Sequence, residues 1–142
     1  MSSHLPAAEE NCLNLLLFSV AGVSFAVDLE QIDGMAEHAG ELPDDLHWFH
    51  DELGFACQAM TYRLPTVLSI KTGSGTPYRV IIDNMEEIAE FSFSSITPFP
   101  DLLESHLLSR GLWGVLLRAG KMVLLVDFQR IASNSRMHTY EP

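Results

Sequence analysis

The chain has 142 residues, of which 47% are hydrophobic and 19% are charged. This composition is typical of one globular domain and excludes a disordered chain. The net charge is −11, and residues 1–62 contain 11 of the 19 acidic residues and no Lys or Arg, whereas residues 63–142 contain eight acidic and eight basic residues. Because nucleic acids and anionic membranes would repel the first part of the chain, we expect neither as a partner.

Cysteine content and the first apolar run bear on the compartment. Cys12 and Cys57 lie in apolar sequence without the spacing of metal ligands, which favours buried thiols over a secreted disulfide scaffold. The apolar run Leu13–Val27 follows Glu9 and Glu10 rather than basic residues. It is about fifteen residues long, too short to span a bilayer, and it lacks the basic start of a signal peptide. We therefore expect a cytoplasmic protein.

The first elements in chain order are a leader, a hairpin and a loop. Residues 1–11 are small and polar and predict a flexible leader. Leu13–Val20 and Val23–Leu29 predict two strands of a hairpin that turns at Ala21-Gly22. The acidic stretch Gln31–Pro43 predicts a loop.

The middle of the chain predicts one short helix and two strands. Apolar residues recur at helical spacing within Asp44–Leu53, and Gly54 is a suitable residue to end this helix. Thr66–Ile70 and Tyr78–Asp83 are apolar runs of strand length. The stretch TGSGTP lies between them.

TGSGTP raises the question of a phosphate-binding loop. No Gly-Lys pair follows Gly73 or Gly75 at the required spacing, and position 78, where a dinucleotide fingerprint needs glycine, is Tyr78. A strand follows the glycines, so no helix N-terminus is available to hold a phosphate. The stretch therefore predicts a hairpin loop and no nucleotide cofactor.

The last part of the chain predicts further short elements around turn residues. In chain order these are a strand around Phe91 and Phe93, a helical turn over Leu102–Leu108, hairpin strands Gly114–Arg118 and Lys121–Asp127 joined at Ala119-Gly120, a helical turn over Phe128–Ala132, and a flexible tail over 133–142. Many short strands and little helix fit a mainly β fold, barrel or sandwich, rather than a doubly wound sheet.

Two groups of polar residues have both a chemical and a structural interpretation. His47 and His50 would share one face of a helix and, with Glu52, suggest a small metal-dependent hydrolase, although the spacing matches no zinc-protease motif. Asp83 and Asp127 each end an apolar strand, and they form either a catalytic carboxylate pair or caps of the turns that follow. The capping interpretation is favoured, and we expect no catalytic or metal-binding residues.

Three stretches occur in a fixed order between Leu17 and Ile131: LFSVAGVSFAVDLEQIDGM, PYRVIIDNMEEI and LWGVLLRAGKMVLLVDFQRI. Together they resemble the CheW-like domain of bacterial chemotaxis adaptors and kinases, which would span residues 12–132. The matching positions are Phe18, Gly22, Phe25, Ala26, Val27 and Ile32 in the first stretch, Asp83 and Ile88 in the second, and Gly114, Gly120, Leu125, Asp127 and Ile131 in the third.

The resemblance implies a fold of two small SH3-like β-barrels around a shared core. It also implies a non-enzymatic cytoplasmic scaffold that joins the regulatory domain of a two-component histidine kinase to chemoreceptors. We expect partner contacts at the end of the second strand and at the entry to the last hairpin, with plain core packing as the alternative. The expected contact residues are Val27, Leu29, Ile32, Leu112 and Trp113.

One part of the chain departs from the family pattern. Members carry an Asn-Leu-Arg-Gly stretch, whose arginine belongs to a partner surface, and residues 36–66 are too short to include it; only Leu53-Gly54 matches the end of that region. We therefore expect an incomplete first barrel with exposed strand edges, and a homodimer that covers them. The alternative function is a diverged, self-associating CheW-like module in another pathway, such as surface motility.

Overall fold

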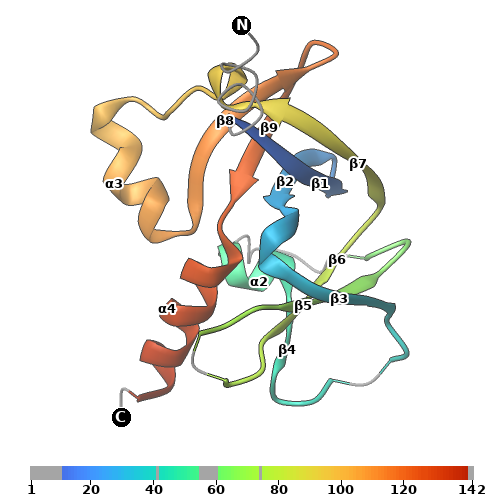
Figure 1. Cartoon of the computed structure of the whole chain (residues 1–142). Helices are drawn as coiled ribbons and strands as arrows, with labels where there is room; N and C mark the ends of the chain where they lie inside the picture. Colours follow the sequence, from blue (N-terminus) through green and yellow to red (C-terminus); the bar gives the residue numbers. More distant parts are fainter. Residues whose placement is uncertain (1–10, 41, 55–60, 74, 141–142) are drawn as a thin grey trace, which may run out of the picture.

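The computed structural model describes residues 11–40, 42–54, 61–73 and 75–140, with side chains up to residue 134. Its strands form two sheets, one of five strands and one of four. Figure 1 shows the two sheets one above the other, with helix α2 between them and helix α3 beside β8. The mainly β fold that the sequence predicts is confirmed. In the described part of the chain, no helix is long and apolar enough to cross a bilayer.

The five-stranded sheet has the strand order β7-β1-β2-β9-β8. We call the unit built on it the second subdomain, and the unit built on the four-stranded sheet the first subdomain. Its strands are β1 (Cys12–Val20), β2 (Val23–Asp28), β7 (Met85–Ser92), β8 (Leu112–Arg118) and β9 (Lys121–Val126). Strand β2 runs parallel to β9, and the other neighbours are antiparallel. The predicted turns at Ala21-Gly22 and Ala119-Gly120 are present, and both residues of each have positive φ, as a type I′ hairpin turn requires.

This sheet curls until its two edge strands, β7 and β8, approach each other. Thr97, beyond β7, forms an isolated antiparallel bridge with Val115 of β8. Arg118 of β8 pairs with Glu87 of β7 and lies 5.5 Å from the centre of the Phe91 ring. A backbone bridge and side-chain contacts thus bring the two edges of the sheet together without pairing β7 to β8, an arrangement consistent with an SH3-like subdomain. Its interior holds a small core, formed by Leu15, Leu17, Ala26, Leu116, Val123 and Leu125.

The first subdomain is built on the four-stranded sheet, in the order β3-β5-β6-β4. Its strands are β3 (Ile32–Glu37), β4 (Leu46–Trp48), β5 (Thr66–Ile70) and β6 (Arg79–Ile82). Strands β5 and β6 are antiparallel neighbours, which confirms the hairpin around TGSGTP. A small core lies on the face of this sheet that points away from the five-stranded sheet. It has only three buried residues among those described: Leu46, Val67 and Ile81.

A central core lies between the two sheets, as the family resemblance implies. It contains four phenylalanines that contact one another with ring centroids 4.7–6.4 Å apart: Phe18, Phe25, Phe49 and Phe128. Two of them come from helices α2 (Phe49–Leu53) and α4 (Phe128–Tyr140). The short helices η2 (Leu29–Gln31) and η3 (Phe93–Ser95) and helix α3 (Asp101–Ser109) complete the fold.

Two predicted elements in the first subdomain are wrong. Residues 32–37 form strand β3 rather than a loop, because β5 supplies hydrogen-bond partners that local sequence does not reveal. The predicted helix Asp44–Leu53 forms only from Phe49 onward. Its first half is strand β4, which pairs in parallel with β6.

Three predictions in the rest of the chain are also corrected. The strand expected around Phe91 and Phe93 begins earlier, at Met85, and ends before η3. Helix α4 continues past Ala132 to Tyr140, since no Gly or Pro interrupts it; the flexibility of residues 133–142 stays a prediction. Cys12 is half-buried rather than buried. Cys57 and residues 1–10 lie outside the described residues.

Candidate protein-interaction surfaces

The expected contact residues near the end of β2 lie between the subdomains. Val27 is fully buried in the central core, so for this side chain the core-packing interpretation is right. Leu29 and Ile32 are half-buried and pack against the same core. These two side chains are thus the ones in this region that a partner can reach.

The expected contact residues at the entry to β8 are both half-buried. Leu112 packs against the central core, like Leu29 and Ile32, whereas Trp113 packs against the core of the second subdomain. The structure therefore brings Val27, Leu29, Ile32 and Leu112 to one core and leaves Trp113 on another. Their role in partner binding stays a prediction.

Gln31 joins these regions, and sequence reasoning missed it. Its amide nitrogen donates to Asp127 Oδ1 at 3.1 Å, and its amide oxygen accepts from the Phe128 backbone N–H at 2.8 Å. These bonds tie η2 to the junction of β9 and α4. Asp127 Oδ1 also accepts from the Arg130 N–H at 3.1 Å, so the predicted cap at Asp127 is confirmed.

Asp83 also caps backbone N–H groups, but not those of the turn that follows it. Its carboxylate is buried and accepts from the N–H groups of Arg63 at 3.2 Å and Leu64 at 2.7 Å. These residues precede β5. Asp83 therefore fixes the chain where it enters β5. The two aspartates bind separate backbone segments and do not form a catalytic pair.

The residues of the proposed metal site do not share a helix. His47 lies on β4, where its ring stacks on Tyr78 at 5.0 Å, and its Nδ1 is 3.9 Å from Glu52 Oε2. His50 lies on α2, with its Nδ1 3.0 Å from the Tyr62 hydroxyl. In the described ranges no three His, Cys, Asp or Glu side chains group as metal ligands would. The hydrolase interpretation assumed that His47 and His50 share one face of a helix, and this assumption is wrong.

Two buried tyrosines hold these side chains in place. The Tyr78 hydroxyl donates to Glu52 Oε1 at 2.5 Å, and burial followed by the charge of Glu52 raises the pKa of Tyr78 strongly. The Tyr62 hydroxyl accepts from the His50 backbone N–H at 3.1 Å, and burial raises the pKa of Tyr62 to about 12. Both phenols stay protonated at neutral pH, and their hydrogen bonds support the α2 region.

The first subdomain opens to solvent at one end. A cavity of about 150 Å³ there is lined by Ala36, Glu37, His38, Ala39, Pro43, Leu46, Val67, Ser69 and Arg79. Three large apolar side chains of the same subdomain are 44–62% exposed: Met35, Leu42 and Leu64. The expected incomplete first barrel is consistent with this opening. Leu42 is next in the chain to the lining residue Pro43, and Leu64 precedes Pro65, whose carbonyl accepts from the His38 N–H. Met35 faces the other side of β3, because it pairs with the core residue Leu68. Exposed apolar side chains such as Leu42 and Leu64 are typical of a protein-binding surface.

The charges around this opening are mainly acidic. Glu37 and His38 line the cavity, Asp44 is exposed next to the lining residue Pro43, and Asp33 is exposed at the other end of β3. Arg63, exposed next to Leu64, adds one positive charge. The guanidinium of Arg79 binds both carboxylate oxygens of Asp45, at 2.7 and 3.1 Å, and this hydrogen bonding holds the pKa of Asp45 below its usual value. The positive charge of Arg79 is thus largely neutralised, and the rim favours a partner that carries basic residues.

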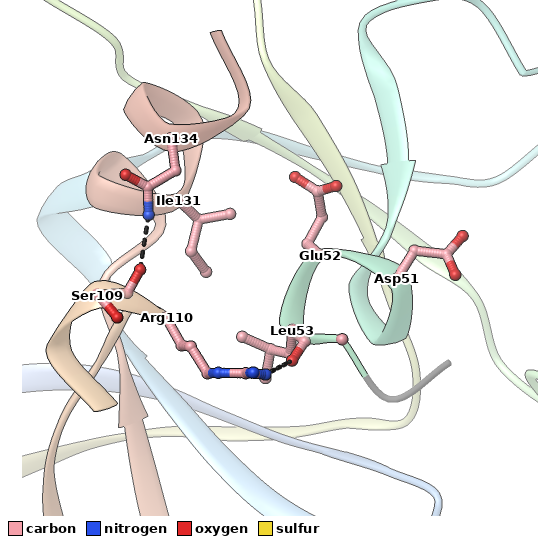
Figure 2. Close-up of a pocket in the computed structure, with 8 residues that line it drawn as sticks. Asp51, Glu52, Leu53, Ser109, Arg110, Ile131 and Asn134 are labelled. Atoms are coloured by element: carbon pink, nitrogen blue, oxygen red, sulfur yellow. Dashed lines mark hydrogen bonds between the residues drawn. The ribbon is translucent and has the colours of Figure 1, made fainter. Parts of the chain in front are cut away.

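A second cleft, of about 270 Å³, lies where α2, the end of α3 and α4 meet (Figure 2). Arg110 Nη1 donates to the Leu53 carbonyl at 3.3 Å, and Asn134 Nδ2 donates to the Ser109 carbonyl at 2.7 Å. Each bond joins two helices. We assign this cleft to the packing of the helices, because Arg110 and Asn134 bind backbone groups across it, while Asp51 and Glu52 pair with side chains of the chain itself.

Comparisons with known proteins identify the fold. No protein-family model matches the chain, and no curated protein matches its sequence. Among solved structures, the chain is similar to the scaffolding protein TtCheW from Thermoanaerobacter tengcongensis, with a TM-score of 0.63 and 13% sequence identity. The alignment covers 84% of this chain and 91% of TtCheW. The fold is therefore CheW-like, as the sequence resemblance implies.

Proposed function

We propose that this chain is a non-enzymatic adaptor that couples the regulatory domain of a histidine kinase to chemoreceptors or related signalling proteins. The observation that carries the proposal is the CheW-like fold, which extends over most of both chains compared, and the other protein is described as a scaffolding protein. The proposed activity is binding alone, without turnover and without a cofactor.

The partner surface that we propose includes the open end of the first subdomain. The exposed Leu42 and Leu64 side chains and the acidic rim support this location, because a partner with an apolar side chain flanked by basic residues would complement both. Leu29 and Ile32 extend the proposed surface toward the central core. In this proposal the arginine that the family pattern would supply is not needed, because the partner provides the basic groups.

The homodimer expected from the sequence is the second candidate. The three exposed side chains Met35, Leu42 and Leu64 favour self-association, but two copies meeting at the same end would bring their acidic rims together. Light scattering at tens of micromolar distinguishes the two cases. A dimer mass would support the self-associating module, and a monomer mass would exclude the homodimer.

The proposed function is tested by isothermal titration of the purified full chain. The titrants are the regulatory domain of the organism's own chemotaxis-type kinase and the signalling tip of its chemoreceptor. We expect one of them to bind, and we expect Leu29→Asp and Ala36→Arg to weaken binding at least about tenfold, a loss typical of central interface residues. Leu117→Asp, on the exposed end of β8, is the matched control.

Three results would contradict this proposal. If neither protein binds, the chain is not an adaptor of this class. If Leu29→Asp folds and keeps wild-type affinity, the contact assigned to Leu29 is wrong. Capture from native lysate with identification by mass spectrometry extends the test to other partners, and recovery of the chain alone would favour the self-associating module.

A further inference from the structure

Helix α3 presents an apolar surface that the proposed function does not use. It begins after Pro100 and ends at Ser109, and none of its side chains is buried. Leu102 is 93% exposed and Leu103 is 50% exposed. Large apolar side chains exposed together on one helical turn are a recurrent feature of helix-docking surfaces. In Figure 1 the helix stands beside β8, away from the first subdomain.

The body of the protein holds the C-terminal part of this helix in place. Leu107 and Leu108, in its last turn, are half-buried, and β8 is the element against which α3 packs most extensively. At its C-terminus the Arg110 side chain binds the Leu53 carbonyl, and Asn134 binds the Ser109 carbonyl (Figure 2). Nine residues are too few for a stable isolated helix, so these attachments keep α3 helical. A partner would meet a preformed surface, which lowers the entropic cost of binding.

The charges of α3 select the kind of partner. Asp101 and Glu104 flank the two exposed leucines, and α3 itself contains no Lys or Arg. Acidic residues in a first turn also favour the helix dipole, which accounts for their sign but not for the exposed leucines. The exposed His106 lies in the last turn of α3, and the nearest Arg or Lys in sequence, Arg110, donates across the cleft to α2. The exposed turn is therefore apolar and negatively charged.

We propose that α3 is a second docking surface, specific for a basic amphipathic helix of another protein. Apolar side chains of that helix, spaced three and four residues apart, would cover Leu102 and Leu103, and its Lys or Arg residues would face Asp101 and Glu104. A second copy of this chain fits less well, because its α3 would present the same carboxylates. An anionic lipid surface would be repelled.

The test is a binding titration of the full chain with two synthetic probes. One probe is a fluorescent amphipathic peptide of Leu and Lys, and the other is the same peptide with every Lys replaced by Glu. We expect the Lys peptide to bind, to bind more weakly as salt is added, and to shift the backbone NMR signals of α3. We expect the Glu peptide not to bind.

Variants separate α3 from the rest of the acidic surface. Leu102→Asp should weaken binding of the Lys peptide at least about tenfold, as loss of a central interface side chain does. Leu117→Asp replaces an equally apolar leucine that is 71% exposed on β8 and should leave the affinity within about twofold. Because both leucines are largely exposed, the circular dichroism spectra of both variants should match the wild type.

Several results would overturn the assignment. They are equal weakening by Leu102→Asp and Leu117→Asp, equal binding of the two peptides, and NMR shifts centred on another element. A dimer in light scattering that Leu102→Asp dissolves would identify a second copy as the occupant and refute the proposal. The probes contain no chemotaxis protein, so the outcome is independent of the proposed adaptor function.

Discussion

Gly111 offers a sharp test of how the second subdomain is joined to α4. Gly111 lies between α3 and β8 with φ +89°, and its carbonyl accepts from the Asp127 N–H at 2.7 Å. A Cβ at this position would lie 2.8 Å from Cδ1 of Ile131 and closer still to Cγ1. Ile131 is buried in the central core and cannot easily move. Gly111→Ala therefore combines backbone strain with overpacking.

The two contributions can be estimated separately. A non-glycine residue in the left-handed region costs about 1–2 kcal/mol, and inserting a methyl group into a packed core costs about 1–3 kcal/mol. We expect Gly111→Ala to lower the free energy of unfolding by about 3 kcal/mol. Gly120→Ala is the matched control, because Gly120 has φ +79° and no atom within 4 Å of its Cβ position. It should cost about 1 kcal/mol, the backbone contribution alone.

Urea unfolding followed by tryptophan fluorescence measures both variants. Trp48 and Trp113 report on the first and second subdomains, respectively. Adding Ile131→Ala to Gly111→Ala removes the side-chain atoms that clash with the introduced methyl group. The double variant should therefore be more stable than the sum of the single variants predicts, by about 1–3 kcal/mol. Equal costs at Gly111 and Gly120, or strict additivity with Ile131→Ala, would refute the reasoning.

Three further predictions concern polar groups. Asp83→Ala should lower the free energy of unfolding by about 3 kcal/mol in urea titrations, since two backbone N–H groups lose a charged acceptor. The raised pKa of Tyr62 stabilises the fold fully below about pH 10 and loses this effect as pH rises through about 12, so Tyr62→Phe should flatten the alkaline loss of stability. The lowered pKa of Asp45 stabilises the fold above about pH 4 and loses this effect as pH falls further. Arg79→Met should therefore flatten the acid limb of the same stability profile.

Local patterns were sufficient for the hairpins of the second subdomain. Ala-Gly pairs between apolar runs predict tight turns, and the structure has positive φ at Ala21, Gly22, Ala119 and Gly120. The order of three family-like stretches predicted the CheW-like fold, which the structural comparison supports across most of the chain. The glycine-rich loop between β5 and β6 was also predicted, because no helix could follow it.

The first subdomain was harder to predict, for an identifiable reason. Strand β3 has exposed and half-buried residues rather than a clear alternation, and β4 has only three residues. Their strand conformation depends on pairing with β5 and β6, which lie far along the chain. Propensity and periodicity report on neighbouring residues and carry little information about such partners.

The candidate surfaces, too, could be predicted from the sequence only in part. The apolar sequence around Leu29 and the leucines of DLLESHLL are visible in the chain, but their exposure is not. Local sequence determined the turns, the strand-forming runs and the concentration of acidic residues before Arg63. Only the tertiary structure decided that Val27 is buried, that Leu102 is exposed and that the first subdomain has an open end. Burial depends on which distant segments pack over a side chain, and that is a property of the assembled fold.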